Sequence, residues 1–563
     1  MTQSDQPMPI NDRLFYALVA VGTFLNATGL FPPIMELDGA LYACIAKQMA
    51  QTGDFVNLYA VGTDWLDKPH FPFWIAALSY RIFGVNTFGY KFPALLAFLS
   101  SVVYTYHFAR LTYSKAVAQV ATLVLLTAFH GVLSNSDVRA EPYLMPLIIG
   151  PVYHFYRVFL GGRFYHLLLG SLLTGCALMT KGVFVLIPIG AGLILHWLLT
   201  GHWRELLHGR WYLAVVLAVV FTLPEIYCLY QQFDLHPEKV VFGKTGVSGV
   251  KFFFWDSQFG RFFNTGPIKG EGDKFFFVHT LLWAFLPWSL PLYVSVGQAV
   301  TRLIKRQNAL PEYVSLGSGL ATFALFSLSG FQLPHYLNIV FPFYAILTAQ
   351  YLVRLVPIAA RRWTIGQTVI GLLITVLAIG LLLLVQPAQM VSAIVWVVLI
   401  TLATFYFFRQ NSLESLMGRM TGAMLVLAVT LNLFLYPTFL QYQAGMTAAR
   451  YANEQPLLAK QSTILYEPGS GVGGGSFWSY EFYADAPTHY ARTDSTLRKQ
   501  LHSGKKQVFL TAEDADSLSK RGFTLRTLAV FPYFHVSQLT YDFLNPATRS
   551  QTLSPYILAE ATE

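Results

Sequence analysis

The stretch Thr364–Val385, which reads TIGQTVIGLLITVLAIGLLLLV, decides the fold. It contains no charged side chain, and about 20 apolar residues in a helix are enough to cross the hydrocarbon core of a bilayer. Ala423–Leu440 is a second uncharged apolar stretch. Both stretches predict transmembrane helices.

The composition of the whole chain agrees with a membrane protein. Of its 563 residues, 54% are hydrophobic and only 12% are charged, whereas soluble proteins have about 25% charged residues. This excludes a disordered chain and disfavours a soluble multidomain enzyme. Cys44, Cys176 and Cys228 are scattered, so we expect neither a disulfide framework nor a cysteine metal site. Met1–Arg13 lacks the features of a cleavable signal, and we interpret Leu14–Phe31 as an uncleaved first span.

Apolar stretches separated by polar breaks predict an all-α polytopic membrane protein with about thirteen transmembrane helices. Residues 1–440 form the predicted transmembrane domain, with two large connections at 35–90 and 230–274. The predicted spans lie near residues 14–34, 91–111, 116–133, 141–160, 164–180, 183–199, 211–229, 275–299, 313–330, 336–353, 363–385, 391–408 and 420–440.

Lysine and arginine side chains are concentrated in alternate short connections. Cytoplasmic loops carry such an excess of positive charge, so we place the N-terminus in the cytoplasm of a cell with an inner (plasma) membrane. The two large connections and residues 441–563 are then extracytoplasmic. The positively charged connections hold Arg110 and Lys115, Arg157 and Arg163, Arg204 and Arg210, Arg302–Arg306, Arg354–Arg362, and Arg409 and Arg419.

The composition of the chain changes after residue 440. We predict that residues 441–563 form a small extracytoplasmic α/β domain. Gly469–Gly474 matches G-x-G-x-x-G after a strand, but Phe477–Tyr483 beyond it is not clearly helical, so we interpret it as a loop rather than a nucleotide site. The predicted elements are strands at 463–466, 507–511 and 523–531 and helices at 495–502 and 512–521, with Asp494 and Thr511 as N-caps.

Ionisable side chains near the outer ends of the spans are the candidates for function. The first cluster is Glu36-Leu37-Asp38, directly after the first span. Asp38 either caps the helix predicted over Ala40–Ala50 or faces a cavity, where it can accept a proton from an incoming hydroxyl group.

Two further clusters are Asp67-Lys68-Pro69 and Asp137-Val138-Arg139-Ala140-Glu141-Pro142. Lys68 is either part of a surface ion pair of little energetic weight or a cation that Asp67 orients for a ligand, and Asp67 is alternatively a ligand of a divalent metal. Three charges in the short turn of the second cluster are costly at a membrane surface without a function, which makes Asp137 and Glu141 candidate acids.

The remaining candidates are Lys181 between two spans, Arg261 in an aromatic loop, and His335-Tyr336 in a short break. Lys181 alternatively snorkels to the interface, and Arg261 and Tyr336 alternatively anchor there. Together with Lys68, these cations predict a site for an anionic phosphate beside a general base.

At these residues the chain resembles the GT-C class of polyprenyl-phosphate-sugar-dependent glycosyltransferases. It is most similar to the lipid A aminoarabinose transferases and the protein O-mannosyltransferase superfamily, and the resemblance covers residues 14–353. Asp38–Met49 matches in part the family pattern D-E-x-R-Y-A-x-x-A-x-x-M, and Asp67-Lys68-Pro69 matches its E/D-K-P motif. Further matches are Lys91-Phe92-Pro93, Lys181-Gly182, Arg261-Phe262, Leu286-Pro287-Trp288 and Leu333-Pro334-His335-Tyr336. The chain departs from the pattern at Gly39 (an acid in the family), Leu41 (an arginine) and Gln332 (a lysine).

The resemblance implies a GT-C fold and the transfer of one sugar from a polyprenyl-phosphate donor to a lipid, glycan or protein acceptor at the outer leaflet. It involves no nucleic acid and no nucleotide, and it leaves a divalent metal open. The implied catalytic acids are Asp38 with Asp137 or Glu141, and the implied substrate-binding residues are Asp67, Lys68, Lys181, Arg261, His335 and Tyr336.

Two other classes of function are compatible with a polytopic chain. A lipid or glycan transporter without transferase activity predicts internal repeats, broken helices and charges deep within the spans, which the sequence does not show. A binding or assembly protein predicts a tail that recruits a glycan partner and a site without turnover. Turnover of a polyprenyl-phosphate sugar by the purified protein separates the three.

Overall fold

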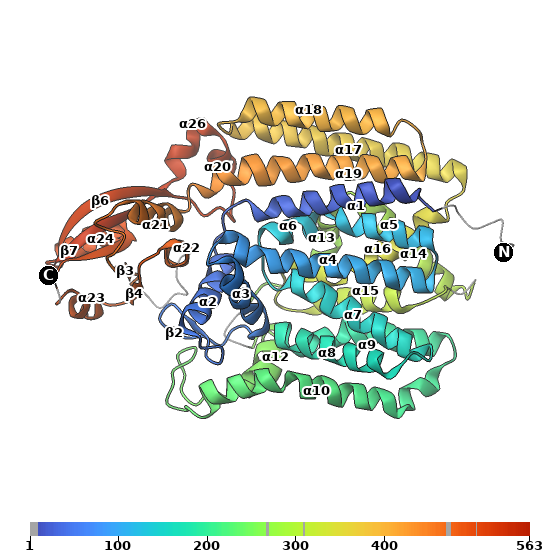
Figure 1. The fold of residues 1–563 in the computed structure, drawn as a ribbon, viewed down its shortest axis with the longest axis horizontal. Coiled ribbons are helices and arrows are strands. Elements are labelled where there is room, and N and C mark those ends of the chain that lie inside the picture. Colours follow the sequence, from blue (N-terminus) through green and yellow to red (C-terminus); the bar gives the residue numbers. More distant parts are fainter. Residues whose placement is uncertain (1–8, 266–268, 308–309, 469–474, 503, 563) are drawn as a thin grey trace.

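A computed structural model describes residues 9–562 except 266–268, 308–309, 469–474 and 503. The helices form an elongated bundle, and a sheet with its own helices lies beyond one end of that bundle (Figure 1). The first helix begins at the opposite end of the bundle, and the last strand ends on the side of the sheet that faces away from the bundle.

The bundle follows the apolar stretches of the sequence, and each predicted span contains at least one helix. Its α-helices are α1 (Asp12–Ala27), α4 (Thr87–Thr112), α5 (Lys115–Leu126), α6 (Phe129–Ser136), α7 (Glu141–Phe159), α8 (Phe164–Lys181), α9 (Leu186–Leu199), α10 (Gly209–Leu229), α13 (Phe276–Ala284), α14 (Ser289–Ile304), α15 (Val314–Leu328), α16 (Phe341–Val353), α17 (Pro357–Val385), α18 (Met390–Phe407), α19 (Leu413–Val429) and α20 (Tyr436–Leu440). Short 3₁₀ or π segments extend them at Thr28–Leu30, Val183–Val185, Trp203–Leu207, Tyr230–Asp234, Pro334–Val340 and Thr430–Leu435.

Seven helical segments of the described residues are long and apolar enough to cross a membrane, and the bent pair α5 and α6 raises the number to eight if it is one span. At the remaining predicted spans the helices are too short or are divided. The stretch 275–299, for example, is split into α13 and α14 around Pro287, which lacks the N–H of a helical residue. A multi-pass helical membrane protein is thereby confirmed, while the number of about thirteen crossings stays a prediction.

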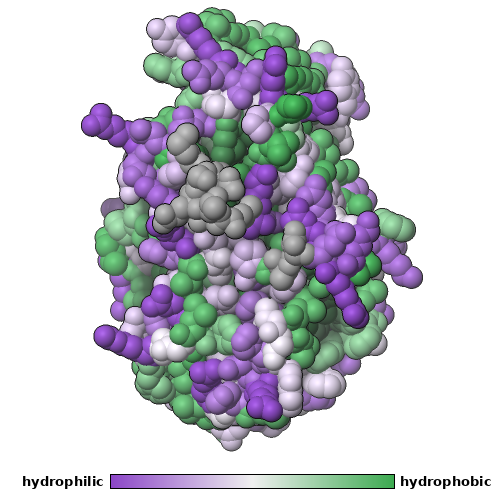
Figure 2. All heavy atoms as spheres, turned by 90° about the vertical axis from the view of Figure 1, so that its right-hand side faces the viewer, coloured by the Kyte–Doolittle hydropathy of each residue, from purple (hydrophilic) through white to green (hydrophobic). Residues whose placement is uncertain are grey.

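The two ends of the bundle differ in what they contact. At the N-terminal end, Lys115 Nζ lies 2.6 Å from Asp12 Oδ1, and Glu414 Oε1 accepts the N–H of Asn11 at 2.9 Å. Hydrophilic side chains are spread across this end of the molecule (Figure 2). The predicted positively charged connections at 110–115 and 409–419 therefore lie at the end farthest from the sheet.

The two large connections, called the outer segments below, lie at the other end of the bundle, and the helices α2 and α3 of the first one stand between the bundle and the sheet (Figure 1). The first large connection folds into α2 (Asp38–Thr52), the short strands β1 (Tyr59–Ala60) and β2 (Thr63–Asp64), and α3 (Phe71–Phe83). The second contains α11 (Gly249–Lys251), a π segment at Phe252–Asp256 and α12 (Ser257–Phe262).

The C-terminal region is a small α/β domain, as predicted. Its five strands have the order β4-β3-β5-β7-β6; β3 is parallel to β4 and β5, and β7 is antiparallel to β5 and β6. Its elements are α21 (Ala444–Glu454), β3 (Thr463–Tyr466), α22 (Gly475–Tyr483), β4 (Thr488–Ala491), α23 (Asp494–Leu501), β5 (Lys506–Thr511), α24 (Ala512–Lys520), β6 (Thr524–Tyr533), α25 (Tyr541–Leu544), α26 (Pro546–Arg549), a 3₁₀ segment at Ser550–Thr552 and β7 (Ser554–Thr562). The boundary at residue 440 stays a prediction.

Two local predictions for this domain are wrong. The aromatic segment 477–483 is helical in α22, because tertiary packing outweighs the weak helix propensity of its aromatic residues, of which Phe477, Trp478, Tyr480 and Phe482 are buried. The N-cap of α23 is Thr493 rather than Asp494, whereas Thr511 caps α24 as predicted. The glycine-rich motif at 469–474 lies outside the described residues.

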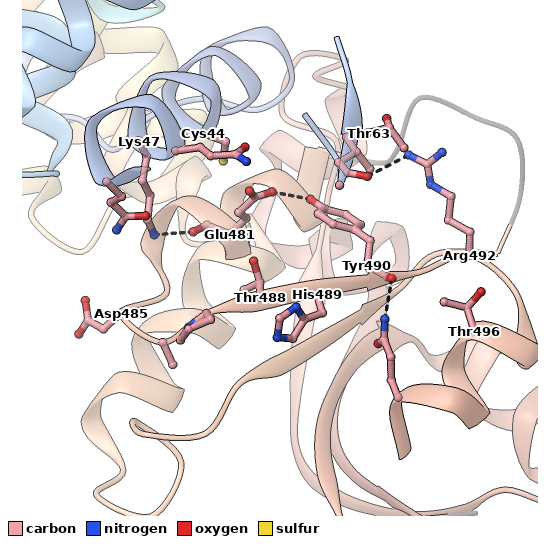
Figure 3. A pocket seen from close by; sticks show the side chains of 17 residues that line it. Cys44, Lys47, Thr63, Glu481, Asp485, Thr488, His489, Tyr490, Arg492 and Thr496 are labelled. Atoms are coloured by element: carbon pink, nitrogen blue, oxygen red, sulfur yellow. Dashed lines mark hydrogen bonds between the residues drawn. The ribbon is translucent and has the colours of Figure 1, made fainter. Parts of the chain in front are cut away.

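The domain is fixed to the outer segments by a seam between α2 and α22. Lys47 Nζ donates to the carbonyl oxygens of Glu481, Phe482 and Ala484 at 2.7–3.0 Å, and it thus satisfies carbonyls at the end of α22. Figure 3 shows this lysine pointing to the end of the helix at the margin of a cavity between the two parts. The seam holds the domain over the outer end of the bundle.

Candidate functional site

Two of the predicted acids are joined by a single arginine. Arg139 Nη1 lies 2.9 Å from Asp38 Oδ2, and Arg139 Nη2 lies 3.0 Å from Asp137 Oδ2. Asp38 is the first residue of α2, and Asp137 directly follows α6. Arg139 was not a candidate from the sequence, although it stands between two acids that were.

The interpretation of Asp38 as a helix cap is wrong. The N-cap of α2 is Leu37, which makes no side-chain capping bond, and the carboxylate of Asp38 is turned to Arg139 instead. Its side chain is 41% exposed, so an approaching hydroxyl group can reach it. The geometry therefore leaves Asp38 available for proton transfer.

A second group of charges lines a pocket between the outer segments and the bundle. Asp67 accepts from the ammonium group of Lys68 through Oδ2 and from the guanidinium of Arg261 through Oδ1. Lys68 belongs to the first outer connection and Arg261 to α12 in the second, so Asp67 joins the two connections. All three side chains face the same pocket.

Burial and charge act in opposite directions on this group. Burial disfavours the ionised form of Asp67, but Lys68 and Arg261 outweigh it and lower the pKa of the carboxyl below its usual value. Burial lowers the pKa of Lys68, and Asp67 opposes this. Asp67 is thus held as a carboxylate between two cations.

The third group enters the same pocket from the bundle. Lys181, at the end of α8, lies 2.8 Å from Glu141 Oε1 at the start of α7. The ammonium group also lies 4.7 Å from the ring centre of Tyr336, a cation–π distance. His335 Nε2 lies 3.8 Å from Glu141 Oε1, but His335 does not line the pocket. Lys181 therefore points inward and does not snorkel to the interface.

The walls of this pocket combine the charges with apolar surface. It is lined by Asp67, Lys68, Pro69, Glu141, Leu144, Thr180, Lys181, Phe184, Val185, Ser257, Gln258, Arg261, Phe262, Leu325, Phe326, Ser329, Phe331, Tyr336 and Ile339. Phe184, Phe262 and Phe326 come from three different parts of the chain. Such walls suit a ligand that has both an anionic group and a hydrocarbon tail.

The Asp38 pair and the pocket belong to one region. Burial raises the pKa of the Tyr42 hydroxyl well above its usual value, and the negative charges of Asp38, Asp67 and Glu141 raise it further. Tyr42 lies on α2, one turn after Asp38. The charges of Asp38, Asp67 and Glu141 therefore all act on this one hydroxyl group, and the charge of Arg139 opposes them.

The described residues do not fit a divalent metal. They contain no group of three or more His, Cys, Asp and Glu side chains placed to hold a metal ion. Both oxygens of Asp67 face cations, which oppose a further positive charge. The interpretation of Asp67 as a metal ligand is therefore not supported by its surroundings.

Two departures from the family pattern have a structural explanation. A Cβ atom on Gly39 would lie 3.3 Å from Asp137 Oδ1, so an acid here would crowd a carboxylate. Gln332 donates to the carbonyls of Phe326 and Ser327 and accepts from the N–H of Asp273, and it does not line the pocket. The pocket is thus built without a side chain from either position.

Comparison of the sequence with known proteins finds one family model and several curated relatives. The family model described as dolichyl-phosphate-mannose-protein mannosyltransferase matches residues 67–228. An undecaprenyl phosphate-alpha-4-amino-4-deoxy-L-arabinose arabinosyl transferase of Pseudomonas aeruginosa (strain UCBPP-PA14) is 28% identical over 330 residues, which cover 57% of this chain and 56% of the relative. An uncharacterised protein of Aquifex aeolicus (strain VF5) is 28% identical over 321 residues, or 56% of this chain and 58% of the relative. The chain thus spans little more than half the length of these curated relatives.

The comparison of structures extends over nearly the whole chain. The crystal structure of ArnT from Cupriavidus metallidurans bound to undecaprenyl phosphate matches with a TM-score of 0.73 at 18% identity, over 97% of each chain. The chain has the GT-C fold of ArnT. The resemblance to the polyprenyl-phosphate-sugar glycosyltransferases of the ArnT and O-mannosyltransferase type is thereby confirmed.

Proposed function

We propose that the protein transfers a sugar from a polyprenyl-phosphate carrier to an acceptor at the outer face of the inner membrane. The observation that carries the proposal is the pocket in which Lys68, Lys181 and Arg261 converge beside apolar walls. The names of the relatives support it, since they refer to undecaprenyl phosphate and to dolichyl-phosphate-mannose.

The charge of the pocket fits this donor. Its three cations stand against the two carboxylates of Asp67 and Glu141, which leaves one positive charge. A polyprenyl-phosphate sugar is a phosphodiester with one negative charge, so the donor neutralises the pocket. Charge-assisted hydrogen bonds from Lys68, Lys181 and Arg261 to the phosphate would hold it, with Tyr336 as a further donor.

The reaction is a displacement at the anomeric carbon. The bond between this carbon and the phosphate oxygen breaks, and the acceptor oxygen forms the new bond. The departing polyprenyl phosphate gains negative charge, which Lys68 and Arg261 stabilise. Asp38 accepts the proton of the acceptor hydroxyl group, and Asp137, held by the same Arg139, is its partner acid. Glu141 is already committed to Lys181, so we assign it to charge balance and positioning.

We place the active site and the α/β domain outside the cytoplasm. The positively charged connections gather at the end of the bundle opposite to the site, and such loops are cytoplasmic. The hydrocarbon tail of the donor then lies along the outer half of the bundle. The acceptor is a lipid, glycan or protein of the cell envelope.

The test is turnover by the purified protein in lipid nanodiscs. A radiolabelled polyprenyl-phosphate sugar is incubated with candidate envelope acceptors, and we expect label to move to one acceptor with release of polyprenyl phosphate. Movement of the intact donor across vesicle membranes without transfer would instead establish a transporter. Binding without either event would establish a binding protein.

A further inference from the structure

The buried pair of His70 and Glu225 lies next to the phosphate-binding segment but outside the pocket. His70 follows Lys68-Pro69 and precedes α3, and Glu225 lies in α10. Both side chains are fully buried. Neither residue lines the pocket, so neither can touch a ligand bound there.

The pair is joined by two contacts, and a third ties it to the outer connection. Glu225 Oε2 accepts the backbone N–H of His70 at 3.0 Å, and Glu225 Oε1 lies 3.0 Å from His70 Nδ1. His70 Nε2 lies 2.9 Å from the carbonyl oxygen of Val56. A carbonyl oxygen only accepts, so Nε2 carries a proton. Nδ1 and Oε1 face each other within hydrogen-bond distance.

The position of Glu225 also calls for an explanation. It is the only acidic residue of α10, and it falls within the candidate span Gly209–Asp234. An ionisable group at such a place is costly unless it is paired. The described structure gives this carboxylate both the ring and the backbone of His70 as partners.

We propose that His70 and Glu225 form a latch that positions Lys68 for the donor phosphate. The inference rests on the proposed function. Glu225 fixes the backbone two residues after Lys68, and Pro69 between them has a restricted φ angle. On the other side of Lys68, Asp67 is bound by Arg261 of α12. The backbone that carries Lys68 is thus tied to α10 on one side, and Asp67, which binds its ammonium group, is tied to α12 on the other.

Further hydrogen bonds join the first large connection, residues 35–90, to α10 and the π segment that continues it. The side chain of Gln232, in the π segment that continues α10, accepts from Leu58 N–H at 2.9 Å and donates to Leu58 O and Asp64. These bonds still hold Leu58 and Asp64 when the latch alone is removed. Loss of the latch should therefore free Lys68 locally without unfolding the outer connection.

The test compares Glu225→Ala and His70→Ala with Glu225→Gln in nanodiscs. Glutamine can accept from the His70 N–H and donate to Nδ1, so it preserves the latch geometry. We expect the alanine variants to raise the donor KM at least tenfold with a smaller change in kcat, and Glu225→Gln to stay within threefold of wild type. Thr222→Ala is the matched control, because among the described residues this buried hydroxyl on α10 bonds Ala218 of its own helix and no residue of the outer connection.

A second readout does not depend on activity. An amine-reactive reagent should label Lys68 several times faster in the alanine variants than in wild type or Glu225→Gln, as measured by peptide mass spectrometry. Glu225→Asp, whose side chain is one methylene too short to make both bonds, replaces Glu225→Ala if the latter yields no folded protein.

The outcomes are separable. Unchanged donor KM and unchanged Lys68 labelling in folded Glu225→Ala or Glu225→Asp would overturn the latch, as would a Glu225→Gln variant as impaired as the alanine variant. Wild-type protein that neither turns over nor binds undecaprenyl phosphate would overturn the proposed function instead, and the labelling rates would then still decide whether the latch positions Lys68.

Discussion

Arg139 lies 2.9 Å from Asp38 although 101 residues separate them in the chain. The same guanidinium binds Asp137, so one cation holds two acids that would otherwise repel each other. Arg139 thereby holds the side chain of Asp38 in a fixed direction at the end of the bundle that faces the sheet. This arrangement makes the two acids a unit and separates them from Glu141, which pairs with Lys181.

Replacing Asp38 by asparagine should abolish most of the activity. A general base contributes about 10²–10⁴-fold, so we expect turnover to fall at least 100-fold with donor binding nearly unchanged. The pair with Arg139 is partly exposed and worth about 1 kcal/mol or less, so the thermal midpoint should change little. Near-normal turnover of Asp38→Asn would move the role of base to Asp137 or Glu141.

Replacing Arg139 by glutamine should impair both acids at once. Arg139 sets the direction of both carboxylates, and a misplacement of about 1 Å in a reacting group can cost about 10²-fold, so we expect turnover to fall about tenfold or more. Arg139→Lys should restore only part of it, because an ammonium group lacks the planar fork that reaches two carboxylates. Steady-state turnover of the two variants checks this, and a lysine variant equal to wild type would show that the double contact is unimportant.

Lys68→Met and Arg261→Met should weaken use of the donor. The lost charge-assisted contacts are worth about 1.5–3 kcal/mol, which corresponds to a rise of about 10- to 100-fold in the donor KM. Lys251→Met is the control, since this exposed lysine of the same outer region does not line the pocket. Wild-type KM in both test variants would show that the phosphate lies elsewhere.

Stability should depend on pH through Glu36, which lies at the seam with the α/β domain. Burial raises its pKa from 4.5 to about 8, although Ser479 and Ser476 oppose this by hydrogen bonding. The folded state therefore binds a proton that the unfolded state has lost, and stability falls as pH rises between about 4.5 and 8. The slope from this group is at most about 1.4 kcal/mol per pH unit.

Glu36→Gln removes this ionisation and keeps the shape of the side chain. We expect the variant to have a higher thermal midpoint than wild type near pH 8 and a similar one near pH 4.5. Thermal unfolding across this range measures the difference. A difference that does not grow with pH would mean that Glu36 is already ionised in the folded protein.

The proposed orientation can be tested directly. A reporter that is active only in the cytoplasm should be silent when it is fused after Glu563 and active when it is fused before Met1. The reason is that the positively charged connections lie at the end of the bundle opposite to the α/β domain. Cytoplasmic activity at the C-terminus would reverse the topology and place the site inside the cell.

The sequence by itself determined the elements that depend on local pattern. The apolar stretch at 364–385 lies within α17. The strand predicted at 463–466 is β3, whose bounds are those predicted. The sequence also made Asp38, Asp67, Lys68, Glu141, Lys181 and Arg261 candidates for the site, because charged residues at the ends of apolar helices are rare and stand out. Thr511 was recognised as a cap because capping depends on neighbouring residues only.

The tertiary structure alone decided which of these charges meet. Asp67 pairs with Arg261 and Asp38 with Arg139, across separations of 194 and 101 residues that no local pattern encodes. It also decided that 477–483 is helical and that β4 and β7 complete the sheet, because burial against distant residues outweighs local propensity. The assembly of the pocket depends on packing, because the cost of burying Arg261 and Lys181 is offset only when Asp67 and Glu141, from other parts of the chain, lie beside them.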